Sequence, residues 1–224
     1  EVVMDFYTGK ELLQKCHDES LPISEIMKIR EMANTHRDAD CISQKMETVL
    51  SIMKNAAHKP IEHPSKSIGG LIGGEAKKVS DHAASGKNVC GSVLSKAIAY
   101  SMAVLEVNAS MGLIVAAPTA GSAGVLPGVL LAMQDEHALS DETLYKGLLN
   151  ASAIGYLLMR NASVAGAEAG CQAEIGTACC MASAGLAEIC GMSLDQIEYA
   201  AEVSMEHMLG LTCDPICGLV QIPC

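Results

Sequence analysis

Aromatic side chains are scarce in this sequence of 224 residues, which has one Phe, five Tyr and no Trp. Half of the residues are hydrophobic nonetheless, and Ala, Gly, Met and Leu dominate. Because small side chains let helices approach one another closely, this composition predicts an all-α fold with far more helix than the usual share of about a third. We expect a compact helical domain in which glycine-rich loops gather cysteines at helix ends.

Basic residues are also few, since 15 Lys and Arg stand against 26 Asp and Glu, which gives a formal net charge of −11. A surface of this sign repels phosphates, so we expect neither nucleic acid nor an anionic membrane as a partner. The stretch Val107–Gln134 lacks Lys, Arg, Asp and Glu, but Pro118, Pro127 and four glycines interrupt it. These residues would break a membrane-spanning helix, so we predict a buried helix, loop and helix here. Residues 1–13 lack the basic start and apolar block of a signal peptide.

The ten cysteines do not indicate a secreted disulfide scaffold, because such scaffolds are short and rich in loops. We therefore expect a reducing compartment, the cytoplasm. Within predicted helices, a cysteine behaves as a small buried apolar residue. This interpretation applies to Cys16, Cys41, Cys90, Cys179, Cys180 and Cys190.

We expect amino-terminal helices over residues 1–57 and a helical domain that carries the site over residues 58–224, with one continuous domain as the alternative. Thr8 and Glu11 form a capping-box pattern for a short helix through Cys16. Pro22 is expected to open a longer helix. Apolar residues recur at helical spacing along that helix and predict its buried face. They are Ile42, Met46, Val49, Leu50 and Met53.

Later helices have recognisable boundaries. One is expected over Val89–Ala109, and Asp141 is expected to cap another that reaches Arg160. Ser193 and Gln196 form a capping box for a helix that is predicted to end at Gly210.

Two glycine-rich segments separate these helices. The first, at residues 69–74, lacks the spacing of a phosphate-binding loop, although Lys77 or Lys78 beyond it could reach a substrate carboxylate instead of lying in a solvated turn. The second, AAPTAGSAGVLPG at residues 116–128, can hold a carboxylate on free backbone N–H groups. Its alternative role is that of a connector in a packed bundle.

Cysteines recur in two segments that are predicted to lie at helix ends. In EAGCQAEIGTACC, Cys171 falls at a helix N-terminus, where the helix dipole favours the thiolate. In GLTCDPICGLVQIPC, Cys213 follows the predicted end of a helix by three residues. Thiolates from two loops suit a metal or iron–sulfur centre better than a disulfide in a reducing compartment. The spacing itself matches no short ferredoxin or zinc-finger pattern.

The motifs GGLIGGEAKK, APTAGSAGVLPG, EAGCQAEIG and LGLTCDP…GLVQIPC resemble those of the α subunit or α domain of iron–sulfur-dependent bacterial L-serine dehydratases. This resemblance covers most of the chain. It implies a [4Fe–4S] cluster held by Cys171, Cys213 and Cys224, with Cys217 ranked below Cys224 as a ligand. It also favours the second glycine-rich segment as the loop that binds the substrate. The implied substrate-binding residues are Pro118, Thr119, Ala120, Gly121, Ser122 and Gly124.

The resemblance implies conversion of L-serine to pyruvate and ammonia in an oligomer that includes a β subunit or β domain. Three thiolates on a four-iron cluster leave one iron open as a Lewis acid. Related α domains continue beyond the IPC motif, so we expect this chain to be a fragment that is inactive alone. Two alternatives stay open. One is an iron–sulfur cysteine desulfidase, and the other is a helical scaffold with a structural zinc site or a redox sensor.

Overall fold

The computed structural model describes residues 5–213, and it confirms the predicted all-α class. Within these residues there are ten helices and no β-strand. The helices are α1 (Gly9–Glu19), α2 (Ile23–Thr35), α3 (Ala39–Glu62), α4 (Glu75–Ala84), α5 (Gly91–Ala109), α6 (Val125–His137), α7 (Asp141–Asn161), α8 (Gly166–Ala169), α9 (Cys171–Ile189) and α10 (Leu194–Glu206).

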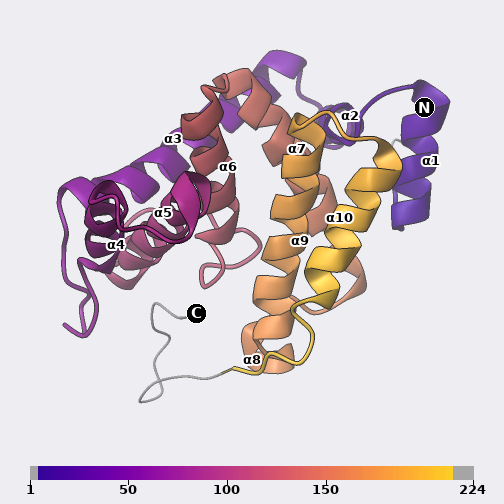
Figure 1. Cartoon of the computed structure of the whole chain (residues 1–224). Coiled ribbons are helices and arrows are strands. Elements are labelled where there is room, and N and C mark those ends of the chain that lie inside the picture. The colour runs from indigo at the N-terminus through magenta and orange to yellow at the C-terminus, as the bar shows by residue number, and fades with distance from the viewer. Residues whose placement is uncertain (1–4, 214–224) are drawn as a thin grey trace.

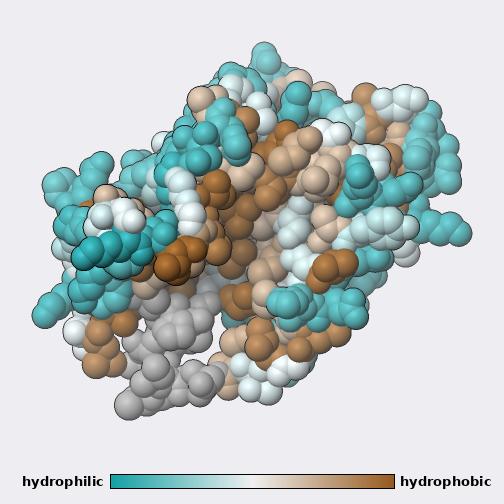
Figure 2. All heavy atoms as spheres, viewed as in Figure 1, coloured by the Kyte–Doolittle hydropathy of each residue, from teal (hydrophilic) through white to brown (hydrophobic). Residues whose placement is uncertain are grey.

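The helices form two groups that lie side by side (Figure 1). Helices α3 to α6 make up one group, and α1, α2, α7, α9 and α10 make up the other, with α8 at one end of α9. Apolar residues gather between the two groups and hydrophilic residues cover the outer rims (Figure 2). The two groups are joined because α6 packs on α9 and α3 packs on α7.

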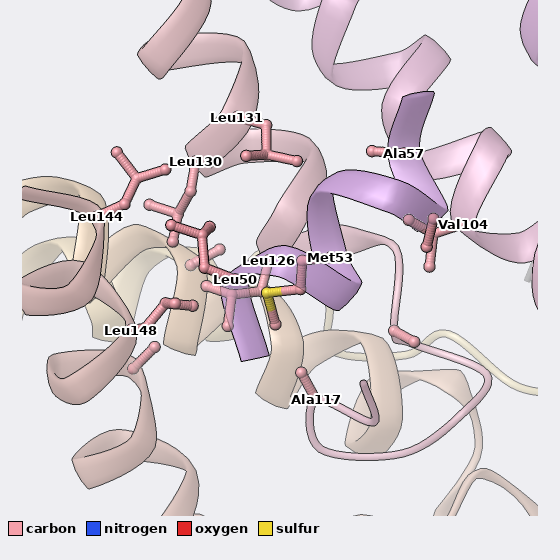
Figure 3. Close-up of a cluster of buried hydrophobic side chains, with 14 of the residues drawn as sticks. Leu50, Met53, Ala57, Val104, Ala117, Leu126, Leu130, Leu131, Leu144 and Leu148 are labelled. Carbon is pink, nitrogen blue, oxygen red and sulfur yellow. The ribbon is translucent and has the colours of Figure 1, made fainter. Parts of the chain in front are cut away.

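Two clusters of buried apolar side chains hold these groups together. The first joins α3, α5, α6 and α7 around residues such as Met53, Val104, Leu130 and Leu148 (Figure 3). The second joins α1 and α2 to α7, α9 and α10. The expected division after residue 57 falls within α3, which contributes to the first cluster, while α1 and α2 before it contribute to the second.

Small residues allow the close helix packing that the composition predicts. Where α7 crosses α9, a Cβ atom at Gly185 would lie only 2.6 Å from the backbone oxygen of Gly147. The two backbones can therefore approach this closely only because position 185 is glycine. Among the described residues, no helix is long and apolar enough to cross a membrane.

The caps confirm some of the predicted boundaries. Ser193 and Gln196 form the predicted capping box of α10. Thr8 caps α1 as predicted, but the carboxylate of Glu11 accepts the N–H of Tyr7 rather than that of Thr8. Ser140, rather than Asp141, provides the cap of α7.

The long helix expected from Pro22 is wrong, because the chain turns between α2 and α3. His36 adopts a left-handed conformation with φ of 53° and ends α2. Asp38 then accepts the N–H of Cys41 and starts α3. Because Asp is a strong N-cap, this second start is stable despite the continuing apolar pattern. The helix expected to reach Gly210 is also shorter, since α10 ends at Glu206.

Candidate functional site

Four of the predicted site residues, Thr119, Gly121, Cys171 and Cys213, lie at or near the N-terminal end of α9. Cys171 is the first residue of this helix and is half-buried. It follows Gly170, whose φ of 77° lies in the left-handed region. Glycine adopts this φ without the strain that a Cβ atom would cause, so the chain can leave α8 and enter α9 at this position. The positive end of the α9 helix dipole lies at Cys171, the first residue of the helix.

The segment that follows α10 is hydrogen-bonded to the same end of α9. The N–H of Gln172 donates to the backbone oxygen of Leu211 at 2.9 Å, and the Gln172 side chain accepts the N–H of Gly210 at 2.9 Å. A Cβ atom at Gly170 would lie 2.8 Å from the oxygen of Leu211 and 3.6 Å from the nitrogen of Cys213. The backbone before Cys171 is thus in contact with the backbone that carries Cys213, whose side chain is exposed.

The glycine-rich loop between α5 and α6 is held in shape by Ser122, which is only 1% exposed. Its hydroxyl donates to the backbone oxygen of Ala117 at 3.1 Å and accepts the N–H of Thr119 at 3.3 Å. From α5, the Asn108 side chain donates to the backbone oxygen of Ala120 at 3.1 Å. These bonds leave the N–H groups of Ala120 and Gly121 with no acceptor among residues 5–213.

Glu174 connects this loop to α9. The Thr119 hydroxyl donates a hydrogen bond to Oε1 of Glu174. A Cβ atom at Gly121 would lie 2.6 Å from Oε1, and one at Gly166 would lie 2.5 Å from Oε2. The half-buried Glu174 carboxylate therefore lies between the loop and α8, with a glycine close to each oxygen.

Glu174 is not among the site residues predicted from the sequence. The available signal was its spacing, because residues three apart in a helix share a face and Glu174 lies three residues after Cys171. Its partner Thr119 lies 55 residues away in the sequence, so the contact itself has no local signal.

The two lysines that follow the first glycine-rich segment form local ion pairs. Lys77 pairs with Asp81 at 3.1 Å and Lys78 lies 3.9 Å from Glu75, all on α4. The start of α4 is held instead by Glu106, which is 1% exposed and accepts the N–H groups of Gly74 and Ala76 at 3.0 and 2.8 Å. The glycines of this segment therefore form a tight turn that leads into α4.

The six cysteines expected to be buried in helices divide into three kinds, of which Cys41 and Cys179 are half-buried. Burial raises the pKa of both Cys16 and Cys180 to about 12, so these thiols stay protonated and are poor metal ligands. For Cys90 and Cys190 the expectation is wrong, because they lie at the ends of α5 and α9 and are exposed.

Two of the three predicted ligands, Cys171 and Cys213, lie within the described residues. Cys224, like Cys217, lies outside the described residues. Within residues 5–213, no group of three or more His, Cys, Asp or Glu side chains is arranged to hold a metal ion. The structure thus places two of the three predicted ligand positions, Cys171 and Cys213, on backbone segments in contact.

Comparison of this sequence with known protein families identifies its family. The profile of the family described as "Serine dehydratase alpha chain" matches residues 18–224. This chain belongs to the serine dehydratase alpha chain family. It is 39% identical over 217 residues to the "L-serine dehydratase, alpha chain" of Peptoniphilus asaccharolyticus, a match that covers 97% of this chain and 74% of that protein. It is 40% identical over 219 residues to the "Probable L-serine dehydratase, alpha chain" of Bacillus subtilis, covering 98% of this chain and 73% of the relative.

Other members of the serine dehydratase family are longer. The "L-serine dehydratase" of Helicobacter pylori strain 26695 is 40% identical over 228 residues, covering 100% of this chain but 50% of that protein. The chain thus spans about half the length of such relatives. The site at the start of α9 lies within the part that they share with it.

Proposed function

We propose that this chain is the α part of an L-serine dehydratase, which converts L-serine to pyruvate and ammonia with the help of a [4Fe–4S] cluster. One observation of the structure carries the proposal. Two predicted ligand positions, Cys171 and Cys213, and the glycine-rich loop that ends at Gly124 converge on the N-terminal end of α9. Membership of the serine dehydratase alpha chain family supports the same reaction.

The residues present suit an iron–sulfur cluster. Thiolates are the usual ligands of such clusters, and Cys171 lies where a helix dipole favours the thiolate. Cys213 is exposed on a segment that hydrogen bonds hold against α9. Cys224 is the third proposed ligand. When bound, the cluster would supply a Lewis acid that weakens the bond between the serine Cβ and its hydroxyl.

We assign substrate binding to the loop from Pro118 to Gly124. The N–H groups of Ala120 and Gly121, which have no acceptor within residues 5–213, are suited to the substrate carboxylate. Ser122 takes a different role from the one expected, because its buried hydroxyl is directed at Ala117 and shapes the loop. Thr119 positions Glu174.

We further propose that the active protein is a cytoplasmic oligomer that also contains a β subunit or β domain. The lengths of the relatives support this, since the "L-serine dehydratase" of Helicobacter pylori contains about as much sequence outside the matched region as within it. In the reducing cytoplasm, the proposed thiolate ligands would remain available for the cluster.

The test is to produce this chain together with its β part without oxygen and to assay L-serine and L-cysteine in parallel. Pyruvate from L-serine, with iron and acid-labile sulfide in the protein, is the expected result. Release of sulfide from L-cysteine without turnover of L-serine would identify a cysteine desulfidase instead. Stoichiometric zinc without sulfide would reject the cluster and the dehydratase together.

A further inference from the structure

We propose that the Glu174 carboxylate binds the α-ammonium group of the amino-acid substrate and so determines specificity for amino acids. This inference rests on the proposed function, because it assigns one group of the serine molecule to a residue that the family comparison does not identify. Its basis is the position of Glu174, its charge and the backbone beside it.

The position of the carboxylate is fixed by its neighbours. Oε1 accepts the hydroxyl of Thr119, and the backbones of Gly121 and Gly166 approach so closely that neither could carry a Cβ atom without displacing Glu174. Glycine at both positions thus lets the two backbone segments lie directly against the carboxylate oxygens.

The charge of Glu174 has no counterpart among the residues that the structure describes. No Lys, Arg or His within residues 5–213 forms an ion pair with it, and the bond from Thr119 is its one hydrogen bond there. A carboxylate has about four acceptor sites, and a half-buried one is stabilised by a charged donor. An ammonium group, with three N–H donors and a positive charge, meets this need.

The carboxylate of an α-amino acid lies two bonds from its ammonium group, so the two binding sites must be adjacent. Gly121 meets this condition because its N–H faces no acceptor in the described chain and its Cα lies beside Oε1 of Glu174. The substrate carboxylate would bind the N–H groups of Ala120 and Gly121 while the ammonium group binds Glu174. Cys171 lies one helical turn before Glu174 on the same face of α9. With the carboxylate and the ammonium group bound in this way, the serine hydroxyl would extend toward Cys171.

The experiment compares L-serine with L-glycerate, which keeps the carboxylate and the terminal hydroxyl but replaces the ammonium group with a hydroxyl. The complete protein, this chain with its β part, is prepared without oxygen as wild type, Glu174→Gln, Glu174→Asp and Glu198→Gln. Glu198→Gln is the matched control, since it removes the same charge from a half-buried position on α10. Calorimetry gives the Kd of both ligands, and steady-state kinetics gives kcat and KM for L-serine.

For Glu174→Gln we expect the Kd and KM for L-serine to rise about 10- to 100-fold, with the Kd for L-glycerate and the iron content unchanged. Glu174→Asp retains the charge and should retain a preference for L-serine. The control should match the wild type. If Glu174→Gln does not fold, the Glu174→Asp protein decides, because loss of its preference would show that the charge is not what selects the ligand.

Other results would overturn the inference. A fall in kcat with unchanged KM would make Glu174 a proton-transfer group, and an equal loss of affinity for both ligands would make it only a support for the loop. A wild type that releases no pyruvate from L-serine would overturn the proposed function, yet the Kd comparison would still decide the role of Glu174. A wild type that binds L-serine no better than L-glycerate would reject the ammonium site.

Discussion

The Thr119 hydroxyl donates a hydrogen bond to Oε1 of Glu174 and so links the loop after α5 to the first turn of α9. The shape of the loop is supported in addition by the buried hydroxyl of Ser122, which donates to the backbone oxygen of Ala117 and lies 3.1 Å from the Thr119 hydroxyl. Changes at the Glu174 contact should therefore alter substrate binding while the loop stays folded. Changes at Ser122 should affect the fold of the loop itself.

Gly121→Ala should weaken substrate binding with little loss of stability. The new Cβ atom would lie 2.6 Å from Oε1 of Glu174, which is the mobile end of a side chain and can move away. That movement would break the bond from Thr119 and displace the carboxylate. We expect the KM for L-serine to rise by about tenfold or more, and Gly121→Val to raise it further or abolish activity.

Gly69→Ala is the matched control for this prediction, because a Cβ atom at that loop glycine would meet nothing within 4 Å. Kinetics and thermal unfolding are measured on the same preparations. A folded Gly121→Ala protein with unchanged kinetics would remove this part of the loop from the substrate site.

Cys171→Ala and Cys213→Ala should each abolish cluster binding, and the sequence predicts the same for Cys224→Ala. Each change removes one of the three proposed thiolate ligands. Cys90→Ala should retain the cluster, since Cys90 is exposed like Cys213 but lies at the start of α5. Iron and acid-labile sulfide are measured after anaerobic purification. Full retention of both in any of the three variants would exclude that cysteine from the site.

The predicted features that were confirmed are those with local signals. The capping box at Ser193 and the helix start at Cys171 depend on residues a few positions apart, so the sequence alone reveals them. The break at His36 was missed because a left-handed histidine has no strong sequence signal and the apolar pattern continues on both sides. The contact between Thr119 and Glu174 was missed because it depends on how α5, α6 and α9 pack.

The ion pair between Asp5 and Arg30 should make stability depend on acid pH. Burial raises the pKa of the Asp5 carboxyl, but hydrogen bonds from Arg30, at 2.7 Å, and from Tyr156 outweigh burial and hold this pKa below its ordinary value. Because the folded pKa is the lower one, the pair stabilises the fold above the unfolded value of about 3.9. This stabilisation is lost as the pH falls through the folded pKa.

Asp5→Asn should therefore lower the free energy of unfolding by about 1–2 kcal/mol at pH 7, and by progressively less as the pH falls below about 4. Denaturant unfolding at several pH values measures the difference. Glu47→Gln, at an exposed position on α3, should show little change at any of them. A deficit in Asp5→Asn that stays constant down to the lowest pH would show that the charge of Asp5 is not its cause.

Gly185→Ala should destabilise the protein whether or not the candidate site is correctly assigned, because the change acts on the crossing of α7 and α9. Its Cβ atom would lie 2.6 Å from the backbone oxygen of Gly147, and a backbone cannot rotate away as the Glu174 side chain can. The two helices would have to separate, at a cost of about 1–3 kcal/mol in the free energy of unfolding. For a protein of this size, each kcal/mol lowers Tm by about 2–4 °C. Gly9→Ala is the helical control, since a Cβ atom there would meet nothing within 4 Å, and an equal Tm for the two variants would contradict the close crossing.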